Sequence, residues 1–556
     1  MQSLPATSYF QREVLLPDTL VASNMTKRTV AVIIGAGPAG LIALKELLEA
    51  GVDAIVLEAS SSLGGVFAAA RIYDGALLTT SSNIVSYGCW PAPHPEVPVM
   101  WAAQEYIEYL NGFVAAHNLA RHIRYETRVT EVLMSEVGVV ITAKTGDMTA
   151  QQLAADHVVV CSGLSSHKPE VGTILPDATA FGGTIIHSSL LRSSAELEGK
   201  RVLIVGAGES GSDICLLAAR VATKAALSMR RGPGYIIPRY VFGLPSDVDT
   251  CRAYHSLPRW LLLSRWHGVK VWIEELCLTR SDDRAVLDAA AAMNKQRGRG
   301  PFERFGCKNT SIAEAVLRHG LALHPGIRAL ERDGAVFADG SRFACDVIVV
   351  CTGYRTQFPF LETTHPELAA ALTDVRSALY KRVFHPDWGT RISFCGFARP
   401  GLGAIPPIAE LQARYVAAAI TGAATLPTAL EMRSVIVRDA ALERSTFPDD
   451  ATRVAALTDY APMMDALAGL LGVRPSVIEL LLGGHWRLAW KLFFSSLSGA
   501  QFRLRGPGAS WETASCAIEA YPTLPMPVVL WELAALVVCR LLSSLGFSSC
   551  ALRMSS

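Results

Sequence analysis

Two glycine-rich loops of the same spacing carry the clearest chemistry in this sequence. The first lies in VIIGAGPAGLI, where Gly35, Gly37 and Gly40 separate an apolar run at 30–34 from a helical pattern that ends at Gly51. In a GxGxxG loop the first glycine forms a tight turn, the second lets the backbone approach a pyrophosphate, and the third lets helix and strand pack closely. The N-terminus of the helix then favours the anion. We therefore expect a dinucleotide here, a structural turn being the alternative.

The residues after the first loop favour a ribose that carries no phosphate. The run VDAIVLE has the pattern of a strand and ends in Glu58, 23 residues after Gly35. A carboxylate at that place binds ribose hydroxyls. The expected nucleotide is FAD, and its predicted site consists of Gly35, Ala36, Gly37, Pro38, Ala39, Gly40 and Glu58.

The second loop has a different neighbour and predicts a different ligand. Gly206, Gly208 and Gly211 follow an apolar run and open a helical pattern. The next strand-like run ends at Arg230 and Arg231 instead of at an acid. Guanidinium groups bind phosphate in a bidentate way, so the pair suits the 2′-phosphate of NADPH. A solvated basic turn is the alternative, above all for Arg231. Together the two loops predict hydride transfer from NADPH to a bound flavin.

The composition excludes several other classes of protein. A chain of 556 residues is long enough for about two to four domains. Its 51 Lys and Arg residues nearly balance 50 Asp and Glu residues, so we expect no nucleic-acid partner. The 12 cysteines form no CxxC pairs, and they indicate neither a disulfide framework nor a metal site.

A third motif makes the interpretation more specific. Phe181, Gly183 and His187 fit FxGxxxH and lie between the two glycine loops. This order of motifs resembles the flavin-containing monooxygenases, the class B flavoprotein monooxygenases. The stretches LGGVF, GESGSD, RRGPGYIIPR, CTGYRTQFPFL, PPIAELQARY and QFRLRGPG also match that family. The resemblance extends over roughly residues 28 to 520.

The resemblance implies a set of cofactor contacts and a catalytic cycle. The flavin contacts that it implies are Gly65, Val66 and Phe67, and the NADP contacts are Ser210, Gly211, Ser212 and Asp213. In the implied cycle NADPH reduces FAD, oxygen adds to form a hydroperoxyflavin, and a soft nucleophile takes the distal oxygen. The implied substrates are lipophilic amines or thioethers. His187 either supports the contact between the cofactor domains or is a hydrogen-bonded structural histidine.

Two departures from the family pattern leave alternatives open. Thr79 stands where the family has an asparagine beside the flavin, and Thr80 offers a further hydroxyl. This change raises the alternative of an uncoupled NADPH oxidase that makes hydrogen peroxide. Leu191 stands where Baeyer–Villiger enzymes have an aromatic residue, which argues against oxygenation of a ketone. A membrane-bound flavoprotein with a redox-sensing or assembly role is the alternative that is not an enzyme.

The expected fold class is α/β, with two doubly wound Rossmann-like nucleotide-binding domains and a helical C-terminal region. The predicted parts are a leader (1–27), the FAD domain (28–167 and 331–440), the inserted NADP domain (168–330, with an insert at 241–300) and the C-terminal region (441–556).

The apolar stretch at 526–550 is a candidate membrane anchor, which Glu532 and Arg540 interrupt. A buried soluble helix is the alternative. By resemblance, we expect the endoplasmic reticulum membrane on its cytosolic face, or else the cytoplasm. A homo-oligomer is a further expectation.

Overall fold

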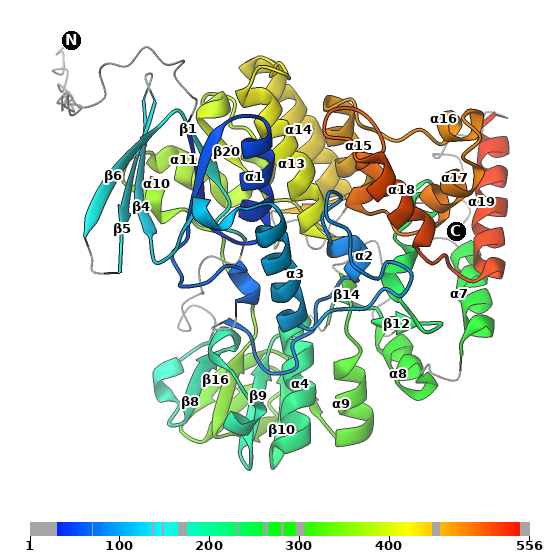
Figure 1. Cartoon of the computed structure of the whole chain (residues 1–556). Coiled ribbons are helices and arrows are strands. Elements are labelled where there is room, and N and C mark those ends of the chain that lie inside the picture. Colours follow the sequence, from blue (N-terminus) through cyan, green and yellow to red (C-terminus); the bar gives the residue numbers. More distant parts are fainter. Residues whose placement is uncertain are drawn as a thin grey trace, which may run out of the picture.

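The computed structural model describes residues 30–68, 71–135, 138–146, 149–164, 175–230, 233–258, 261, 265–279, 283–295, 306–446 and 456–544. Two parallel sheets mark two nucleotide-binding units, and helices of the C-terminal region pack beside them (Figure 1). The predicted leader at 1–27 and Arg231 lie outside the described residues. The predicted fold class is confirmed.

The first sheet brings together strands that are far apart in the chain. Its order is β20–β7–β1–β2–β3, with parallel pairing throughout. The strands are β1 Val30–Ile34, β2 Asp53–Leu57, β3 Ile123–Arg124, β7 His157–Val160 and β20 Ile392–Phe394. Because β20 comes after the whole second sheet in the chain, the second sheet lies within the stretch of sequence that joins β7 to β20.

The second sheet has the order β15–β10–β9–β19–β8 and is also parallel. Its strands are β8 Thr184–His187, β9 Arg201–Val205, β10 Lys224–Ser228, β15 Ala322–His324 and β19 Val347–Val350. The boundary predicted at residue 330 falls too early, because the buried run of β19 pairs with β9 and β8. The second unit therefore continues to Val350.

Smaller sheets complete the two units. Two are three-stranded and antiparallel: β4 Arg128–Met134, β5 Val139–Lys144 and β6 Ala150–Ala155, and β16 Ile327–Glu331, β17 Gly334–Phe337 and β18 Arg342–Ala344. The short pairs are β11 Tyr235–Ile236 with β14 Gly306–Cys307, β12 Tyr240–Val241 with β13 Leu244–Pro245, and β21 Arg399–Pro400 with β22 Leu457–Thr458.

The helices cover the sheets and fill the remaining volume. Those of the first unit are α1 Pro38–Glu49, α2 Ser82–Val85, α3 Ala103–Ala116, α10 Pro359–Glu362, α11 Pro366–Ala371, α12 Val375–Ala378 and α13 Ile405–Ile420. Those of the second unit are α4 Glu209–Val221 and α9 Ser311–His319, and those of its insert are η9 Ser246–Asp249, α5 Arg252–His255, α7 Arg265–Cys277 and α8 Arg284–Lys295. The C-terminal region adds α14 Ala429–Thr446, α15 Tyr460–Leu470, α16 Val477–Leu482, α17 Trp486–Phe494, η12 Gly499–Arg503, α18 Trp511–Ala520 and α19 Met526–Ser544.

The helix α19, which contains most of the candidate membrane anchor at 526–550, packs against α5 and α7 of the insert (Figure 1). Its Glu532 is fully buried, and the Cys251 thiol lies 3.8 Å from Glu532 Oε2. Within the described residues, no helix is long and apolar enough to cross a membrane. Glu532 thus faces the protein, because it lies on the side of α19 that packs against the insert. Residues 545–550 of the predicted anchor lie outside the described part.

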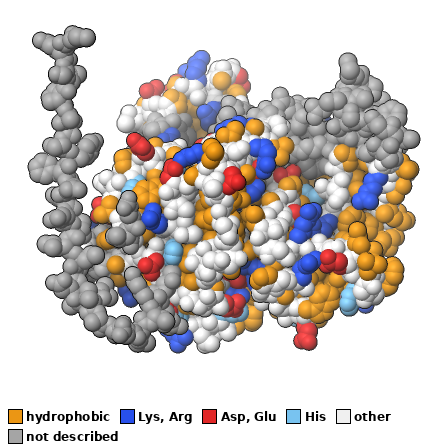
Figure 2. Space-filling view, turned by 90° about the horizontal axis from the view of Figure 1, so that it is seen from above, with side chains coloured by type: hydrophobic (Ala, Val, Ile, Leu, Met, Phe, Trp, Pro, Cys, Tyr) orange, Lys and Arg blue, Asp and Glu red, His pale blue; other side chains and the backbone are white. Residues whose placement is uncertain are grey.

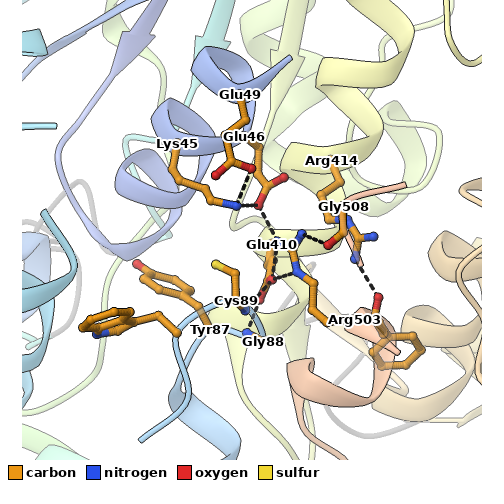
Figure 3. A network of polar contacts seen from close by, with 12 residues as sticks. Lys45, Glu46, Glu49, Tyr87, Gly88, Cys89, Glu410, Arg414, Arg503 and Gly508 are labelled. Carbon is orange, nitrogen blue, oxygen red and sulfur yellow. Dashed lines mark hydrogen bonds and ion pairs between the residues drawn. The ribbon is translucent and has the colours of Figure 1, made fainter. Parts of the chain in front are cut away.

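A buried ion network joins the C-terminal region to the first unit (Figure 3). Arg503 of η12 lies between Glu46 of α1 and Glu410 of α13, and the Lys45 ammonium lies 3.0 Å from Glu46 Oε1. Glu46, Cys89 and Glu410 are close enough to share one metal ion, but the guanidinium already supplies the positive charge there. We therefore assign this cluster to structure, where it ties the last turns of α1 to α13 and η12.

Candidate active site

The first glycine loop has the geometry that a bound pyrophosphate needs. Gly35 has φ +105°, a conformation that favours glycine, and a Cβ atom at Gly40 would lie 1.8 Å from the Gly35 carbonyl oxygen. A Cβ atom at Gly65 would lie 3.2 Å from the Cα atom of Gly37. The backbones of 35–40 and 64–67 thus face each other without side chains between them. This cradle, at the N-terminus of α1, fits the phosphates of FAD.

Glu58 lies beside this loop, at the end of β2, as the sequence predicted. Its Oε2 accepts a hydrogen bond from Ala36 N at 2.7 Å, and its Oε1 accepts one from Ser60 N at 2.8 Å. The carboxylate is almost fully buried. It therefore shapes the loop directly and is also placed where a ribose would meet it.

Two residues implied for the flavin loop, Val66 and Phe67, have different surroundings. Phe67 packs edge-on against Tyr106, with ring centroids 5.0 Å apart, whereas the neighbouring Val66 is exposed. Both belong to the short 3-10 helix η2 Gly65–Phe67, which follows the left-handed Gly64. The phenyl ring thus anchors the flavin loop to α3.

The second glycine loop repeats the close contacts of the first and third glycines of the first loop. Gly206 has φ +104°, and a Cβ atom at Gly211 would lie 2.1 Å from the Gly206 carbonyl oxygen. The cysteine after the neighbouring strand also recurs: Cys161 N donates to Ile34 O at 2.9 Å, and Cys351 N donates to Val205 O at 2.8 Å. Each unit thus positions its loop by the same contacts.

Arg230 lies at the carboxyl edge of the second sheet, and its binding of a 2′-phosphate stays a prediction. It follows β10, and its side chain lies against Gly326, where a Cβ atom would come within 2.9 Å of Arg230 Cγ. The loop at Gly206 is next to it, because Gly206 N donates to Ser228 O at 3.1 Å. The described half of the arginine pair therefore shares an edge with the predicted NADP loop.

Asp213 was expected to contact NADP, but other protein groups surround its carboxylate. Oδ2 accepts from the Tyr73 hydroxyl at 2.8 Å, and Oδ1 accepts from Arg239 at 2.9 Å and Asn309 at 2.7 Å. Burial and the carboxylate together raise the pKa of Tyr73 far above its usual value, so the phenol remains a donor. Asp213 is therefore a hub that ties the segment before Leu78 to the second unit.

The other residues around this loop have structural partners. Ser212 is buried with its hydroxyl 3.4 Å from Cys307 Sγ, while Ser210 lies partly exposed in the first turn of α4. Glu209 Oε1 accepts from Lys308 N at 2.8 Å, and burial raises the pKa of Glu209. Sequence reasoning missed Tyr73, Lys308 and Asn309, since none of them lies in a recognisable motif.

The FxGxxxH motif forms one edge of the second sheet. A Cβ atom at Gly183 would lie 2.6 Å from the Phe181 ring, so glycine leaves room for that ring. His187 ends β8, with Nε2 3.1 Å from Gly353 O and Nδ1 2.9 Å from the Ser189 hydroxyl. The imidazole thus ties β8 to the turn after β19.

Thr79 and Thr80 lie in a bend that one backbone hydrogen bond and one bond to a side chain hold at its two sides. Leu78 N donates to Trp101 O at 2.9 Å, and Ser81 N donates to Asp247 Oδ2 at 2.7 Å. Thr80 is buried and Thr79 partly exposed. Asn83, four residues after Thr79, donates a hydrogen bond from its side-chain amide to Pro95 O at 2.8 Å.

Two parallel sheets with duplicated glycine loops define a protein that binds two dinucleotides. The chain belongs to the flavin-binding monooxygenase-like family, whose sequence model matches residues 27–523. The prediction of FAD and NADPH as cofactors is thereby confirmed.

Three known proteins illustrate the similarity. A 4-hydroxybenzoate brominase (decarboxylating) of Pseudoalteromonas luteoviolacea is 34% identical, over 93% of this chain and 98% of its own. Flavin-containing monooxygenase 5 of Homo sapiens is 28% identical, over 89% of this chain and 92% of its own. The structure of cyclohexanone monooxygenase from Rhodococcus sp. Phi1 bound to NADP+ shares the fold, with a TM-score of 0.58 and 19% identity over 80% of this chain and 98% of that chain.

Proposed function

We propose that this protein is an NADPH- and oxygen-dependent flavin monooxygenase that oxidises a soft nucleophile, and that the nucleophile is bromide used to brominate a phenolic acid. Bromide is a soft nucleophile, but it differs from the amine or thioether that the resemblance implied. The observation that carries the proposal is the near full-length similarity to two proteins named 4-hydroxybenzoate brominase (decarboxylating), at 34% and 31% identity. The flavin-containing monooxygenases from guinea pig, mouse, rat and human reach 28% or 29%.

The site is consistent with chemistry that the cofactors perform. When bound, FAD supplies the oxygen activation, and NADPH supplies the electrons. The protein's part is to bind and orient the cofactors and to keep water away from them. In balance, NADPH, oxygen, bromide and two protons give NADP+, hypobromous acid and water. Hypobromous acid then brominates the phenolic acid at the carbon that carries the carboxyl group. Bromine replaces this group, and carbon dioxide and water are released.

A second candidate is oxygenation of an amine or thioether. The similarity to the flavin-containing monooxygenases supports it. The likeness in fold to cyclohexanone monooxygenase, at 19% identity, concerns architecture and gives no support to ketone oxygenation.

The deciding experiment supplies the purified holoenzyme with NADPH, oxygen and 4-hydroxybenzoate, with and without bromide, and follows the products by mass spectrometry. A brominated phenol that requires both bromide and NADPH supports the proposal. Parallel reactions contain a tertiary amine, a thioether or a ketone. An N-oxide or sulfoxide without any brominated product favours the second candidate, and an ester favours Baeyer–Villiger chemistry. Peroxide alone in every reaction favours the NADPH oxidase.

Thr79 offers a direct test of coupling. We expect Thr79→Asn, which restores the family's amide, to lower the peroxide formed per NADPH consumed. The matched control is Thr79→Ser, which keeps a hydroxyl and should leave that ratio near the wild-type value.

We further propose that the outer face of α7 and α19 rests on a membrane surface. Figure 2 shows orange side chains gathered at the right-hand end of the molecule, where these helices lie in Figure 1. The large apolar side chains exposed there are Val269, Trp272, Leu276, Leu530, Leu533, Val537, Val538 and Leu541. Apolar faces of this kind lie at the headgroup boundary of a bilayer.

Sedimentation with liposomes tests this proposal. We expect the wild type to bind vesicles and Trp272→Ser/Leu276→Ser to bind them less. Leu430→Ser, at an exposed apolar position of α14, is the matched control. A wild type that ignores vesicles but dimerises through this face would instead support the predicted homo-oligomer.

A further inference from the structure

The short helix η9 of the insert carries two acids that face different parts of the molecule. Asp249 Oδ2 lies 3.0 Å from the ammonium of Lys270, in the cluster that also holds Glu532 of α19. Asp247 makes different contacts, although it is only two residues earlier. Its Oδ2 accepts the 2.7 Å hydrogen bond from Ser81 N, next to Thr79 and Thr80.

The same oxygen of Asp247 also meets a cation. Lys308 Nζ lies 3.5 Å from Asp247 Oδ2, and the side chains of both residues are almost fully buried. The backbone N–H of Lys308 donates to Glu209 Oε1 at 2.8 Å, and Glu209 is the first residue of α4, directly after Gly208. A continuous chain of polar contacts therefore runs from the Thr79 bend to the second glycine loop.

We infer that Asp247 and Lys308 are positioning residues that couple the NADP loop to the flavin-side bend at Thr79–Ser81. The inference rests on the proposed use of FAD and NADPH, but not on which nucleophile is oxidised. The residues at 81, 209, 247 and 308 come from four separate stretches of sequence, so their contacts form only in the folded chain. Neither Asp247 nor Lys308 is assigned a contact with the reacting atoms.

The opposite charges of Asp247 and Lys308 make it costly to move one of the two residues without the other. A buried carboxylate and a buried ammonium are stable only while they remain paired, because each alone would bear the full cost of desolvation. Asp247 Oδ1 has no hydrogen-bond partner among the described residues, so Oδ2 bears both contacts. A displacement of Lys308 therefore acts directly on the oxygen that holds Ser81. In this way the state of the NADP loop is transmitted to the bend.

The coupling predicts two measurable consequences of breaking the pair. NADP+ should stabilise the protein less, because binding at the second loop no longer fixes the bend. Without any nucleophile, NADPH is oxidised slowly and hydrogen peroxide forms. This oxidation should become faster, because the bend no longer helps to keep water away from the cofactors.

The test compares Asp247→Asn with Asp249→Asn in the holoenzyme. Asparagine keeps the shape at residue 247 and an oxygen for Ser81 N, but it removes the charge that Lys308 faces. We expect Asp247→Asn to weaken NADP+ binding and to accelerate peroxide-forming NADPH oxidation, each about tenfold, the scale of one lost charged hydrogen bond. NADP+ binding is read from the rise in melting temperature that saturating NADP+ produces. Asp249→Asn should lower the melting temperature and leave both readouts unchanged.

A second pair of variants guards against a simple loss of folding. Lys308→Met should reproduce the effects of Asp247→Asn, and Lys308→Arg, which keeps the charge, should restore most of the wild-type behaviour. The inference is overturned if Asp247→Asn and Lys308→Met lower only the melting temperature, as Asp249→Asn does. Neither readout needs bromide or an organic substrate, so failure here is distinct from failure of the proposed bromination.

Discussion

Arg503 and Glu410 form an ion pair in the interior, with the guanidinium Nε 2.7 Å from Glu410 Oε1 and both side chains at most 2% exposed (Figure 3). The other oxygen of Glu410 accepts from Gly88 N at 2.5 Å. The pair thus connects the C-terminal η12, the helix α13 and the segment that follows α2. Because Arg503 also forms an ion pair with Glu46 of α1, the C-terminal region supports the helix that begins at the first glycine loop.

We expect Arg503→Met to lower the free energy of unfolding by about 3–5 kcal/mol, because it leaves the buried Glu410 without its cation and leaves Glu46 with Lys45 alone. Retention of FAD should fall in parallel, since α1 loses its support. Unfolding in urea and the absorbance of bound flavin measure the two effects. Arg505→Met is the control: its pair with Glu479 is exposed, so the loss should be at most about 1 kcal/mol. Equal losses in the two variants would refute the role assigned to Arg503.

We expect substitution of the third glycine of each loop to impair the binding of one cofactor only. Gly40→Ala should abolish FAD binding, because its Cβ atom would lie 1.8 Å from the Gly35 carbonyl oxygen. Gly211→Ala, with 2.1 Å to Gly206 O, should retain FAD but lose its reduction by NADPH. Flavin absorbance before and after NADPH separates the two. Gly112→Ala in α3, where a Cβ atom meets nothing within 4 Å, should behave as wild type.

Arg230 should determine the preference for NADPH over NADH. Arg230→Ala removes a charge-assisted contact to the 2′-phosphate, which NADH lacks. We expect kcat/KM for NADPH to fall about tenfold or more, the scale of a lost charged hydrogen bond, with little change for NADH. An equal fall for both cofactors would mean that Arg230 supports the fold and does not bind the phosphate.

Glu532 predicts a pH-dependent stability. Burial raises its pKa from 4.5 to about 9, and nearby Asp249 adds to the rise while Lys270 opposes it. A raised pKa means that the folded state holds a proton which the unfolded chain has already lost. This site's contribution to stability therefore falls as the pH rises from about 4.5 to about 9.

The variant Glu532→Gln isolates that effect, because glutamine has the shape of the protonated acid. We expect the variant and the wild type to be equally stable at pH 4.5. At pH 8.5 the free energy of unfolding of the variant should exceed that of the wild type by about 1–3 kcal/mol. Urea unfolding at several pH values gives the difference. A difference that does not change with pH would contradict a protonated Glu532.

The sequence by itself determined the local parts of the cofactor sites. The spacing of the glycines, the acid at Glu58 and the arginine at Arg230 were readable because each depends on a strand, a turn and a helix that are adjacent in the chain. The order of the motifs also indicated the family. The boundary at residue 330 was placed too early, because an apolar run such as 347–350 does not state which of two parallel sheets it joins.

Only the tertiary structure decided what holds these parts in place. Tyr73 with Asp213, Asp247 with Lys308 and Arg503 with Glu410 are separated by 140, 61 and 93 residues, and no pattern within one segment predicts such pairs. The helix α19 illustrates the same limit. Its apolar sequence is compatible with a bilayer, but the buried Glu532 shows which side faces the protein, because a burial preference depends on the surface that covers it and not on composition alone.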